Sequence, residues 1–391
     1  MPQAPTVILR KKLERALAQG HPWLWRDALV PHDWPAGTTV EVHDRRGNFL
    51  ARGITDGGAL GVRIWTTDPR EALDRRLFAR RFDEALQLRR RVTPPRTGGI
   101  RLLHGEGDRT PGVVCDVYGE VAVVKLDGDG IARWHADVLE ALRGPLGALG
   151  VETLLLRNGR REEAQCDVVW GTQPEGPLTF EERGMTLWVD VVHGQKTGMF
   201  LDHRESRARV RELAADARVL NLFGYTGGFS IAAGLGGARH VDTVDLAGPA
   251  LALAERGWES NGLDASGHRC HRADAFAFLE HAAARRERWD VIIADPPSFA
   301  PSEEALEAAL ASYRKLHAAC LAVLAPGGLY LGASCSSHVR RDAFDESILA
   351  GAARARRSLQ LLDSWGAAPD HPRLPAFPEG DYLKSTLVRA L

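Results

Sequence analysis

Residues 219–229 read Val-Leu-Asn-Leu-Phe-Gly-Tyr-Thr-Gly-Gly-Phe, a short apolar run that leads into a glycine-rich turn. Such a run predicts a strand buried on both faces, because helices cover both sides of a parallel sheet. Gly224, Gly227 and Gly228 would let the backbone approach a ligand closely and open the next helix. The spacing is not Gly-x-Gly-x-x-Gly, so it does not favour a dinucleotide. The stretch predicts one βα unit with a small ligand at its turn.

Short apolar runs alternate with helical segments from about residue 185 onward. The runs that predict strands are Val219–Leu222, His240–Val244, Val291–Ala294 and Leu329–Gly332. Alternating strands and helices are typical of a parallel sheet with crossover helices. Residues 185–391 are therefore expected to form one α/β domain.

Two smaller segments precede this domain. Residues 1–72 predict a mostly β module, with a helix over Lys11–Leu17 and strands at Thr39–His43, Phe49–Gly53 and Gly61–Trp65. Residues 73–184 predict an α+β connector, with helices over Arg75–Arg91 and near Ala136–Leu142 and strands at Val113–Val117, Val121–Leu126 and Thr153–Leu156. The connector contains no catalytic motif.

Composition limits the class of protein. The 391 residues are 44% hydrophobic and 26% charged, as in a soluble globular protein of two or three domains. No apolar run approaches the roughly 18–20 residues that span a bilayer, so no membrane partner is expected. Five scattered cysteines argue against a disulfide framework and favour the cytoplasm. None has the spacing of a zinc site, so no structural metal is expected.

Charge is distributed unevenly along the chain. Residues 1–100 contain 18 Lys or Arg and 11 Asp or Glu, although the whole chain has a net charge of −1. A basic amino-terminal part fits contact with a polyanion. On charge alone, solvated helix faces explain the bias equally well.

Acidic residues follow the later strands. Asp245 ends the second strand, 21 residues after Gly224, where a carboxylate can accept hydrogen bonds from a ribose diol. Asp274 follows what we take as the next apolar segment, and it could bind an adenine amino group beside Phe276. Residues 295–299 read Asp-Pro-Pro-Ser-Phe, a rigid turn that can hold the polar edge of a planar base. This order resembles that of class I S-adenosylmethionine methyltransferases.

Cys335 indicates which atom of the base reacts. It lies among serines in Ala333-Ser334-Cys335-Ser336-Ser337, at the end of an expected strand. A thiolate that adds to carbon 6 of a pyrimidine makes carbon 5 nucleophilic, whereas methylation of an amino group needs no cysteine. We expect Cys335 to be the nucleophile and Asp295 to be the acid near ring N3. The structural alternative is a small core residue, which is what we expect for Cys320.

Longer motifs resemble one family closely, the bacterial 23S rRNA (cytosine-5) methyltransferases of the RlmI type. The matching stretches are His21–Trp25, His193–Arg204, Phe223–Phe229, Asp295–Phe299, Ser334–Ser336 and Phe377–Lys384. The resemblance implies an amino-terminal PUA RNA-binding domain of β-barrel-like form, a small central domain and a Rossmann-like class I methyltransferase domain. It implies S-adenosylmethionine as cofactor and 23S rRNA, free or in an assembling large subunit, as partner. It leaves a monomer and a homodimer open.

The resemblance also assigns site residues. It places the stretch before the first strand against the cofactor, although Phe200 could instead be core and Lys196 a surface charge. The expected cofactor contacts are Lys196, Thr197, Phe200, Asp202, Asn221, Phe223, Gly224, Tyr225, Thr226, Gly227, Asp245, Asp274, Ala275, Asp295 and Pro296. The expected phosphate contacts are Arg10, Lys11, Lys12 and Arg15.

Some roles stay open in the sequence. Trp23 and Trp25 could stack on bases, but we expect them in the core of the amino-terminal module. Ser298 stands where better-known RNA cytosine-5 enzymes have a second cysteine, so the base that removes the carbon 5 proton is unassigned. Two other functions compete: an RNA guanine-N7 or amino-group methyltransferase, and a non-catalytic RNA-binding assembly factor with a methyltransferase fold.

Overall fold

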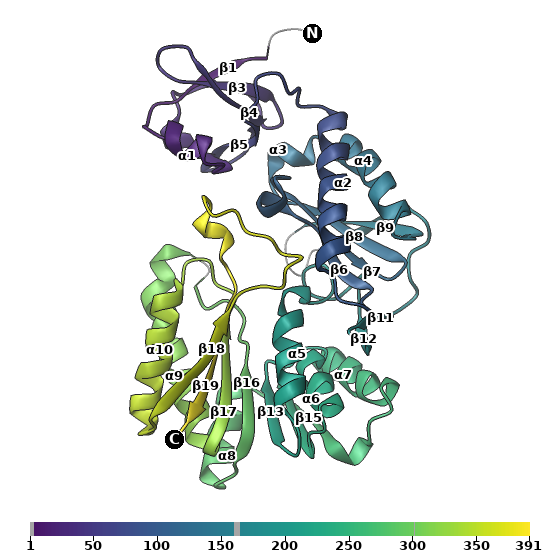
Figure 1. Cartoon of the computed structure of the whole chain (residues 1–391), viewed down its shortest axis with the longest axis vertical. Helices are drawn as coiled ribbons and strands as arrows, with labels where there is room; N and C mark the ends of the chain where they lie inside the picture. The colour runs from purple at the N-terminus through teal and green to yellow at the C-terminus, as the bar shows by residue number, and fades with distance from the viewer. Residues whose placement is uncertain (1–3, 160–164, 301) are drawn as a thin grey trace.

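The computed structural model describes residues 4–159, 165–300 and 302–391. Within these residues the strands form sheets of five, five and seven strands and one two-stranded hairpin. Figure 1 shows the amino-terminal sheet and the seven-stranded sheet at opposite ends of the molecule, with the second five-stranded sheet along one side.

The amino-terminal unit is a small sheet with strand order β1-β3-β4-β5-β2. Its elements are β1 (Thr6–Ile8), α1 (Glu14–Ala18), β2 (Trp23–Trp25), β3 (Thr39–His43), β4 (Phe49–Thr55) and β5 (Leu60–Thr66). The predicted strands are confirmed, but the helix begins at Glu14 and not at Lys11. The backbone N–H groups of Arg10 and Lys11 both bind the carbonyl of Ala28, so this segment cannot join the helix.

The central unit is a second sheet with strand order β10-β9-β8-β7-β6, covered by helices. Its elements are α2 (Arg75–Val92), β6 (Gly99–His104), β7 (Val113–Tyr118), β8 (Val121–Leu126), α3 (Asp129–Ala132), α4 (His135–Gly147), β9 (Thr153–Asn158) and β10 (Gln165–Trp170). The carboxylate of Asp74 caps α2 by accepting the backbone N–H groups of Arg76 and Leu77. The predicted elements are confirmed. The two edge strands of this sheet, β6 and β10, are not among the predicted elements. The pattern of β10 is weak because this strand is largely exposed.

A hairpin of β11 (Leu178–Glu182) and β12 (Met185–Val189) connects the central unit to the last one. Phe180 and Leu187 of this hairpin share one buried cluster with Leu155 of the central sheet and Ile231 of the carboxyl-terminal unit. The expected boundary between residues 184 and 185 lies at the turn of this hairpin. We keep the division into residues 1–72, 73–184 and 185–391 as a proposal, with the hairpin packed against both of the last two parts.

The carboxyl-terminal unit is a seven-stranded sheet with order β15-β14-β13-β16-β17-β19-β18 and helices on both faces. Its elements are α5 (Arg204–Leu213), β13 (Arg218–Leu222), α6 (Gly228–Leu235), β14 (His240–Asp245), α7 (Gly248–Ser260), β15 (His268–Arg272), α8 (Ala275–Ala284), β16 (Trp289–Ala294), α9 (Leu306–Val323), β17 (Leu324–Ser334), α10 (Arg341–Ala355), β18 (Leu359–Trp365) and β19 (Lys384–Ala390). The strands β13 to β17 are parallel, whereas β19 is antiparallel to both neighbours. The α/β fold class is confirmed. The strand order reverses between β13 and β16, where such sheets bind ligands.

One expected strand differs in character from the prediction. The segment before Asp274 is β15, which reads His-Arg-Cys-His-Arg and is not apolar. It is the edge strand of the sheet, so only part of its surface is buried. One polar side chain of β15 has a partner on the neighbouring strand: Nε2 of His268 lies 2.8 Å from the hydroxyl of Thr243 on β14.

A strap formed by residues 366–383, drawn in yellow in Figure 1, runs from β18 back toward the amino-terminal units before entering β19. Phe377 of this strap packs edge-on against Trp23 at 4.6 Å between ring centroids. The expected core position of Trp23 and Trp25 is wrong, because in β2 only Leu24 faces the core. Trp25 is 43% exposed.

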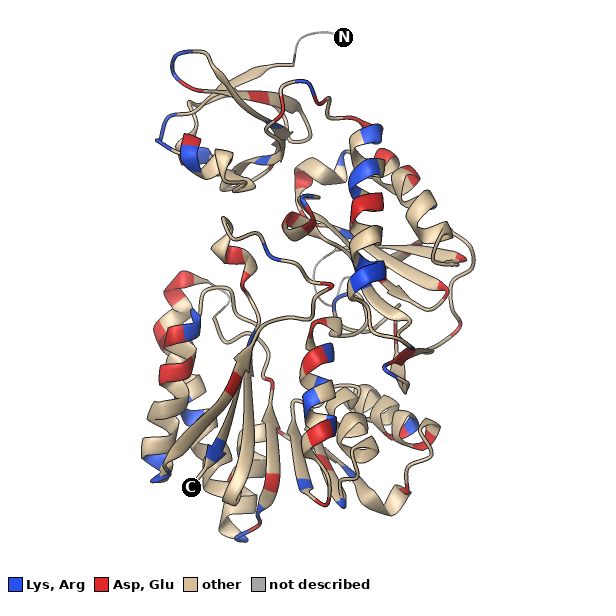
Figure 2. Cartoon of the chain, in the orientation of Figure 1, with Lys and Arg blue, Asp and Glu red and all other residues tan. Residues whose placement is uncertain are grey.

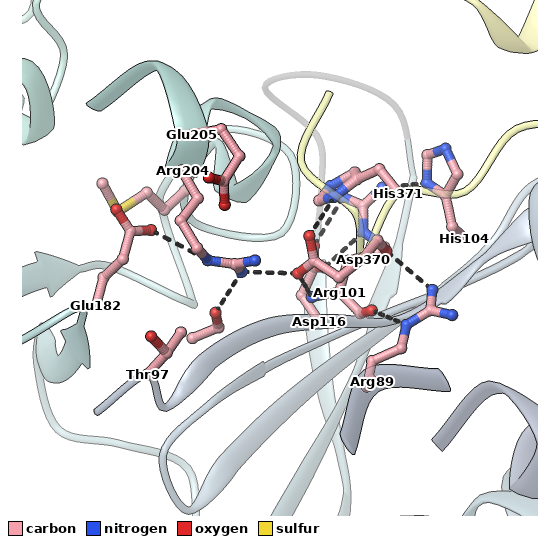
Figure 3. A network of polar contacts seen from close by, with 12 residues as sticks. Arg89, Thr97, Arg101, His104, Asp116, Glu182, Arg204, Glu205, Asp370 and His371 are labelled. Atoms are coloured by element: carbon pink, nitrogen blue, oxygen red, sulfur yellow. Dashed lines mark hydrogen bonds and ion pairs between the residues drawn. The ribbon is translucent and has the colours of Figure 1, made fainter. Parts of the chain in front are cut away.

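A buried ion pair and hydrogen bonds anchor the same strap to α5 and to the central unit (Figure 3). Asp370 accepts hydrogen bonds from Arg204 of α5 at 2.7 Å and from the backbone N–H of Arg101 at 3.0 Å. Arg89 of α2 donates to the carbonyl of Asp370 at 2.9 Å. The ion pair of Asp370 with Arg204, both fully buried, therefore joins the strap to α5, and the hydrogen bonds with Arg101 and Arg89 join it to the central unit. These contacts fix the strap beside the end of the sheet where the strand order reverses.

Candidate active site

A cavity of about 320 Å³ lies at the carboxyl ends of β13, β14, β16 and β17. Parallel strands present these ends at one edge, so loops far apart in sequence meet there. The predicted residues that line it are Phe200, Asp202, Phe223, Gly224, Tyr225, Thr226, Asp245, Asp274, Ala275, Asp295, Pro296 and Cys335. Further lining residues are Gln195, Met199, His203, Arg207, Gly228, Phe229, Val244, Leu246, Ala247, Ala273 and Pro297.

The glycine-rich turn after β13 has a strained backbone. Phe223 and Tyr225 adopt left-handed conformations with φ of 58° and 47°, which are costly for residues other than glycine. Gly224 lies between them, and a Cβ atom there would lie 2.5 Å from Cγ2 of Thr243. The Tyr225 hydroxyl accepts the backbone N–H of Gln195 and donates to the carbonyl of Gly198, both at 2.9 Å. These bonds join the turn to the stretch before β13.

Two carboxylates lie at the ends of the following strands. Asp245 accepts the backbone N–H groups of Tyr225 at 2.9 Å and of Ala247 at 2.8 Å, which fixes its carboxylate at the cavity wall. Asp274 caps α8 by accepting the backbone N–H of Ala277 at 3.0 Å. The side chain of Phe276 packs against the main hydrophobic core and does not line the cavity with Asp274.

The acid and the thiol emerge from neighbouring strands. Asp295 follows β16 and Cys335 follows β17, and the two strands pair in parallel with Ala294 opposite Gly332. The Sγ atom of Cys335 lies 4.0 Å from the carbonyl oxygen of Pro296. Burial, together with the charge of Asp295, raises the pKa of the Cys335 thiol to about 11. The opposing charge of Lys196 lowers this pKa, so the surroundings of the thiol contain both signs of charge.

Four predicted cofactor residues lie outside the lining of the cavity. Thr197 is buried and donates to Asp116 of the central unit, and Lys196 is exposed in a left-handed conformation. Asn221 lies in β13 and donates to the hydroxyl of Ser230. Gly227 caps α6 with φ of 77°. Asn221 and Gly227 shape the turn from behind the cavity.

Sequence reasoning missed His203 and Lys384, although both lie within the matching stretches. His203 lines the cavity, and its Nε2 atom lies 3.1 Å from Oδ2 of Asp295. Lys384 is buried in β19, and its ammonium donates to the carbonyl of Ser336 at 2.5 Å, next to Cys335. A charged residue inside an otherwise strand-like run was the available signal for Lys384.

The cavity has unused polar groups that fit a nucleoside cofactor. Among the described residues, Oγ1 of Thr226 and Oδ1 of Asp202 are buried without a hydrogen-bond partner, and both residues line the cavity. Buried polar atoms are seldom left unpaired in native proteins. The carboxylates of Asp245 and Asp274 have further lone pairs for hydroxyl and amino donors. These residues fit an adenosine-containing ligand.

The chain is similar to known proteins over nearly its full length. The family model of S-adenosylmethionine-dependent methyltransferases matches residues 141–389, and that of PUA-like domains matches residues 7–67. A ribosomal RNA large subunit methyltransferase I from Klebsiella pneumoniae is 36% identical over 396 residues, covering 99% of this chain and 98% of the relative. The chain belongs to the ribosomal RNA large subunit methyltransferase I family.

A second relative supports this family, and two solved structures show the same fold. The ribosomal RNA large subunit methyltransferase I of Escherichia coli O139:H28 is 34% identical over 392 residues, covering 98% of this chain and 99% of the relative. A crystal structure of a methyltransferase complexed with SAH superposes with a TM-score of 0.88 at 23% identity, covering 98% of this chain and all of that one. A SAM-dependent methyltransferase structure from Streptococcus mutans gives a TM-score of 0.87 at 24% identity, with 98% and 100% coverage.

The cofactor and domain content of this methyltransferase follow from the family. S-adenosylmethionine is the cofactor, and a PUA-like domain precedes a Rossmann-like methyltransferase domain. In the part of the chain that the structure describes, no helix has the length and apolar character needed to cross a membrane.

Proposed function

We propose that this methyltransferase modifies carbon 5 of a cytosine in 23S rRNA, either free or within an assembling large subunit. The curated relatives are named as methyltransferases of the large-subunit ribosomal RNA, which supports rRNA as the substrate. The observation that carries the choice of carbon 5 is that Cys335 and Asp295 line one cavity at the ends of neighbouring strands. Methylation of an amino group has no use for a thiol at that place.

The cofactor contacts are proposed from the lining of the cavity. Asp245 would accept the ribose hydroxyls, and Asp274 with Ala275 would contact the adenine edge. Thr226 and Asp202 would use their unpaired oxygens toward the same ligand. S-adenosylmethionine, when bound there, supplies the methyl group.

The reacting residues are proposed to act on the base in turn. The thiolate of Cys335 bonds to carbon 6 of cytosine, which makes carbon 5 nucleophilic. Asp295 binds the ring edge that carries N3 and the amino group, which orients the base and stabilises the charge that develops there. The nucleophile is the thiolate, so the thiol of Cys335, whose pKa burial raises, gives its proton to solvent before the sulfur attacks.

The amino-terminal domain is proposed to bind the RNA backbone. Arg10, Lys11, Lys12 and Arg15 are all exposed on this domain, and Lys11 has an ion pair with Asp27 that an RNA phosphate could replace. Trp25 lies on the same domain with an exposed ring, which adds a surface for base stacking. The family name and the PUA-like domain support this assignment.

The test compares Cys335→Ala with wild type on an unmodified 23S rRNA transcript. We expect wild type to produce 5-methylcytosine, detected by mass mapping of RNA fragments, and the variant to produce none while still binding S-adenosylmethionine. A transcript made with 5-fluorocytidine should form a covalent adduct with wild type, because fluorine cannot leave carbon 5 as a proton does.

Cys166→Ala is the matched control, since Cys166 is also half-buried but lies on β10, outside the cavity lining. It should methylate normally. If Cys335→Ala keeps the wild-type rate, the covalent mechanism is wrong and an amino-group methyltransferase is favoured. If wild type binds no S-adenosylmethionine in a thermal-shift assay, the non-catalytic alternative is favoured.

A further inference from the structure

We propose that His203 and Asp295 together hold one proton, which they lend to N3 of the target cytosine and recover at the end of the reaction. This inference rests on the proposed carbon 5 methylation. It gives His203 a role in the reaction, which no motif in the sequence indicates.

In this pair Asp295 faces the cavity where the substrate would bind, and His203 is the more deeply buried partner. His203 belongs to a short 3-10 helix, Leu201–His203, and its Nε2 atom lies 3.1 Å from Oδ2 of Asp295. The imidazole is 3% exposed, whereas the carboxylate is 20% exposed toward the cavity that contains Cys335. A cytosine in the cavity would therefore take the proton from Asp295. His203 lies behind that carboxylate and holds the proton until then.

The second nitrogen of the imidazole has a partner that suits both protonation states. His203 Nδ1 lies 3.2 Å from Oγ of Ser206 on α5. Ser206 Oγ accepts the indole N–H of Trp365 at 2.8 Å and lies 3.4 Å from Oγ of Ser385, so its own proton can turn between Ser385 and His203. A hydroxyl can accept from a protonated Nδ1 or donate to a deprotonated one. The histidine can therefore change its charge without leaving Nδ1 unpaired.

The charged groups around the histidine favour its protonated form. Burial opposes the positive charge, but the adjacent Asp295 and then Asp202 raise the pKa of His203 above its ordinary value. Arg207 of α5 acts in the opposite direction, although Glu182 of β11 binds its guanidinium through two hydrogen bonds of 2.7 and 2.6 Å. Asp202 in turn accepts the hydroxyl of Tyr382 from the strap at 2.6 Å. Phe229 of α6 covers the ring at 5.4 Å between centroids.

The proton and electron balance of the reaction is closed by this pair. When the thiolate of Cys335 bonds to carbon 6, the π electrons of the carbon 5–carbon 6 bond move to the carbon 4–carbon 5 bond. His203 passes the shared proton to Asp295, and the π electron pair of the carbon 4–N3 bond takes it from there, which leaves His203 neutral and Asp295 negatively charged. Carbon 5 bonds to the methyl group and carbon 4 again forms a double bond to N3. After the carbon 5 proton has left to solvent, the carbon 6–sulfur bond breaks and N3 returns its proton to the pair.

The pH dependence of a single turnover tests this assignment. In wild type the rate needs a thiolate and a protonated His203, so the logarithm of the rate should rise with pH, flatten above the pKa of His203 and fall above about 11, the pKa of Cys335. His203→Gln keeps an amide that can bind Asp295 but has no titratable proton. We expect this variant to react at least about 100-fold more slowly near neutral pH, the lower end of what a general acid contributes. Its rate should keep rising toward the thiol pKa without the flattening.

Two further variants complete the test. His281→Gln removes an exposed imidazole at the other end of the sheet and should leave the profile unchanged. Ser206→Ala keeps His203 but removes the acceptor for its protonated Nδ1, so the flattening should move to lower pH. A His203→Gln variant that binds S-adenosylmethionine and shows the wild-type profile overturns the proposal. If that variant fails to bind, an unmoved break point in Ser206→Ala overturns it.

Failure of the proposal differs from failure of the proposed function. If wild type forms neither 5-methylcytosine nor the adduct with the 5-fluorocytidine transcript, carbon 5 methylation itself is wrong. If wild type forms both the 5-methylcytosine and the adduct, and His203→Gln and Ser206→Ala show the wild-type pH profile, carbon 5 methylation stands. Only the proposal that His203 and Asp295 share a proton is then wrong.

Discussion

Lys384 illustrates what a single residue can do beside the proposed nucleophile. Its ammonium is buried in β19 and donates to the carbonyl of Ser336, the residue after Cys335. It lies 3.4 Å from the carbonyl of Asp381 as well. Burial lowers the pKa of Lys384 to about 8. We infer that Lys384 positions the loop that carries the thiol.

Lys384→Met should slow methyl transfer while binding of S-adenosylmethionine is retained. Methionine keeps the apolar stem but removes a hydrogen bond from a charged donor, worth about 1.5–3 kcal/mol, which corresponds to roughly 10- to 150-fold in rate if it acts on the thiol position. Rapid-quench methylation and cofactor titration measure the two effects separately. Lys315→Met, at an exposed lysine of α9, is the control and should be silent. An undiminished rate in Lys384→Met would show that this contact does not position Cys335.

For the residues of the site, the sequence indicated a place at a strand end more readily than a partner. Asp295 and Cys335 were each expected at the end of a strand, and the strands that precede them, β16 and β17, are neighbours. No role could be assigned to His203 or Lys384 from the sequence, because each contacts a partner far away in the chain. The partner of His203 is Asp295, and that of Lys384 is the carbonyl of Ser336. Single residues reveal such roles only when the fold brings the partners together.

At the scale of elements, the turn between β13 and α6 depends on a glycine for two separate reasons. Gly227 adopts φ of 77°, and a Cβ atom there would lie 2.5 Å from Cβ of Ala254 on α7. Gly237, which follows α6, also has a positive φ of 85°, but its nearest neighbour would lie 3.9 Å away. The two glycines therefore separate backbone strain from close packing.

Gly237→Ala should cost about 1–2 kcal/mol of unfolding free energy, the cost of a left-handed conformation. Gly227→Ala should cost this amount plus about 1–3 kcal/mol for the contact with α7. Only Gly227→Ala should weaken binding of S-adenosylmethionine, because it displaces the strained turn. Urea denaturation and cofactor titration check both statements. Equal losses in the two variants would mean that the contact with Ala254 relaxes freely.

Elements with strong local patterns were predicted well, and those without one were not. The helix α2 was expected at Arg75–Arg91 and spans Arg75–Val92, since its apolar stripe and Asp74 cap are local signals. The strand β15 was expected to be apolar but is polar, and β18 and β19 were not seen. Edge and antiparallel strands of this sheet depend on distant partners, so their own residues carry little signal.

At the scale of the whole molecule, Asp370 joins the strap, the central unit and α5. Its buried carboxylate binds Arg204 and the backbone of Arg101. Burial alone would raise the pKa of Asp370, but the hydrogen bond and charge of His371 and the charge of Arg204 hold this pKa well below its ordinary value. A carboxyl group with a lowered folded pKa stabilises the protein above its unfolded pKa, near 4, and loses this contribution as the pH falls.

Asp370→Asn should lower the unfolding free energy by about 3–5 kcal/mol near neutral pH, because it leaves the buried Arg204 with only the more distant Glu182, at 3.8 Å, as a charge partner. The difference from wild type should shrink as the pH falls below about 4, because the unfolded wild-type chain then takes up a proton that the folded carboxylate, with its lowered pKa, does not. Asp363→Asn is the matched control, since Asp363 of β18 pairs at the surface with Arg209 of α5, the helix that also carries Arg204. It should change stability by at most about 1 kcal/mol. A difference that stays constant down to acid pH would contradict this account.

Local patterns in the sequence were enough to predict the fold class and the cofactor. Short apolar strands, the glycine turn and the Asp-Pro-Pro motif join residues near each other in the chain, so they predict the α/β fold and S-adenosylmethionine. With the cysteine motif they also lead to the proposal that Asp295 and Cys335 act on the base. The tertiary structure alone decided which partners those side chains have. His203 behind Asp295, Lys384 beside Cys335 and Phe377 against Trp23 are contacts between distant segments. No local pattern encodes them, because only the strand order and the returning strap bring those segments together.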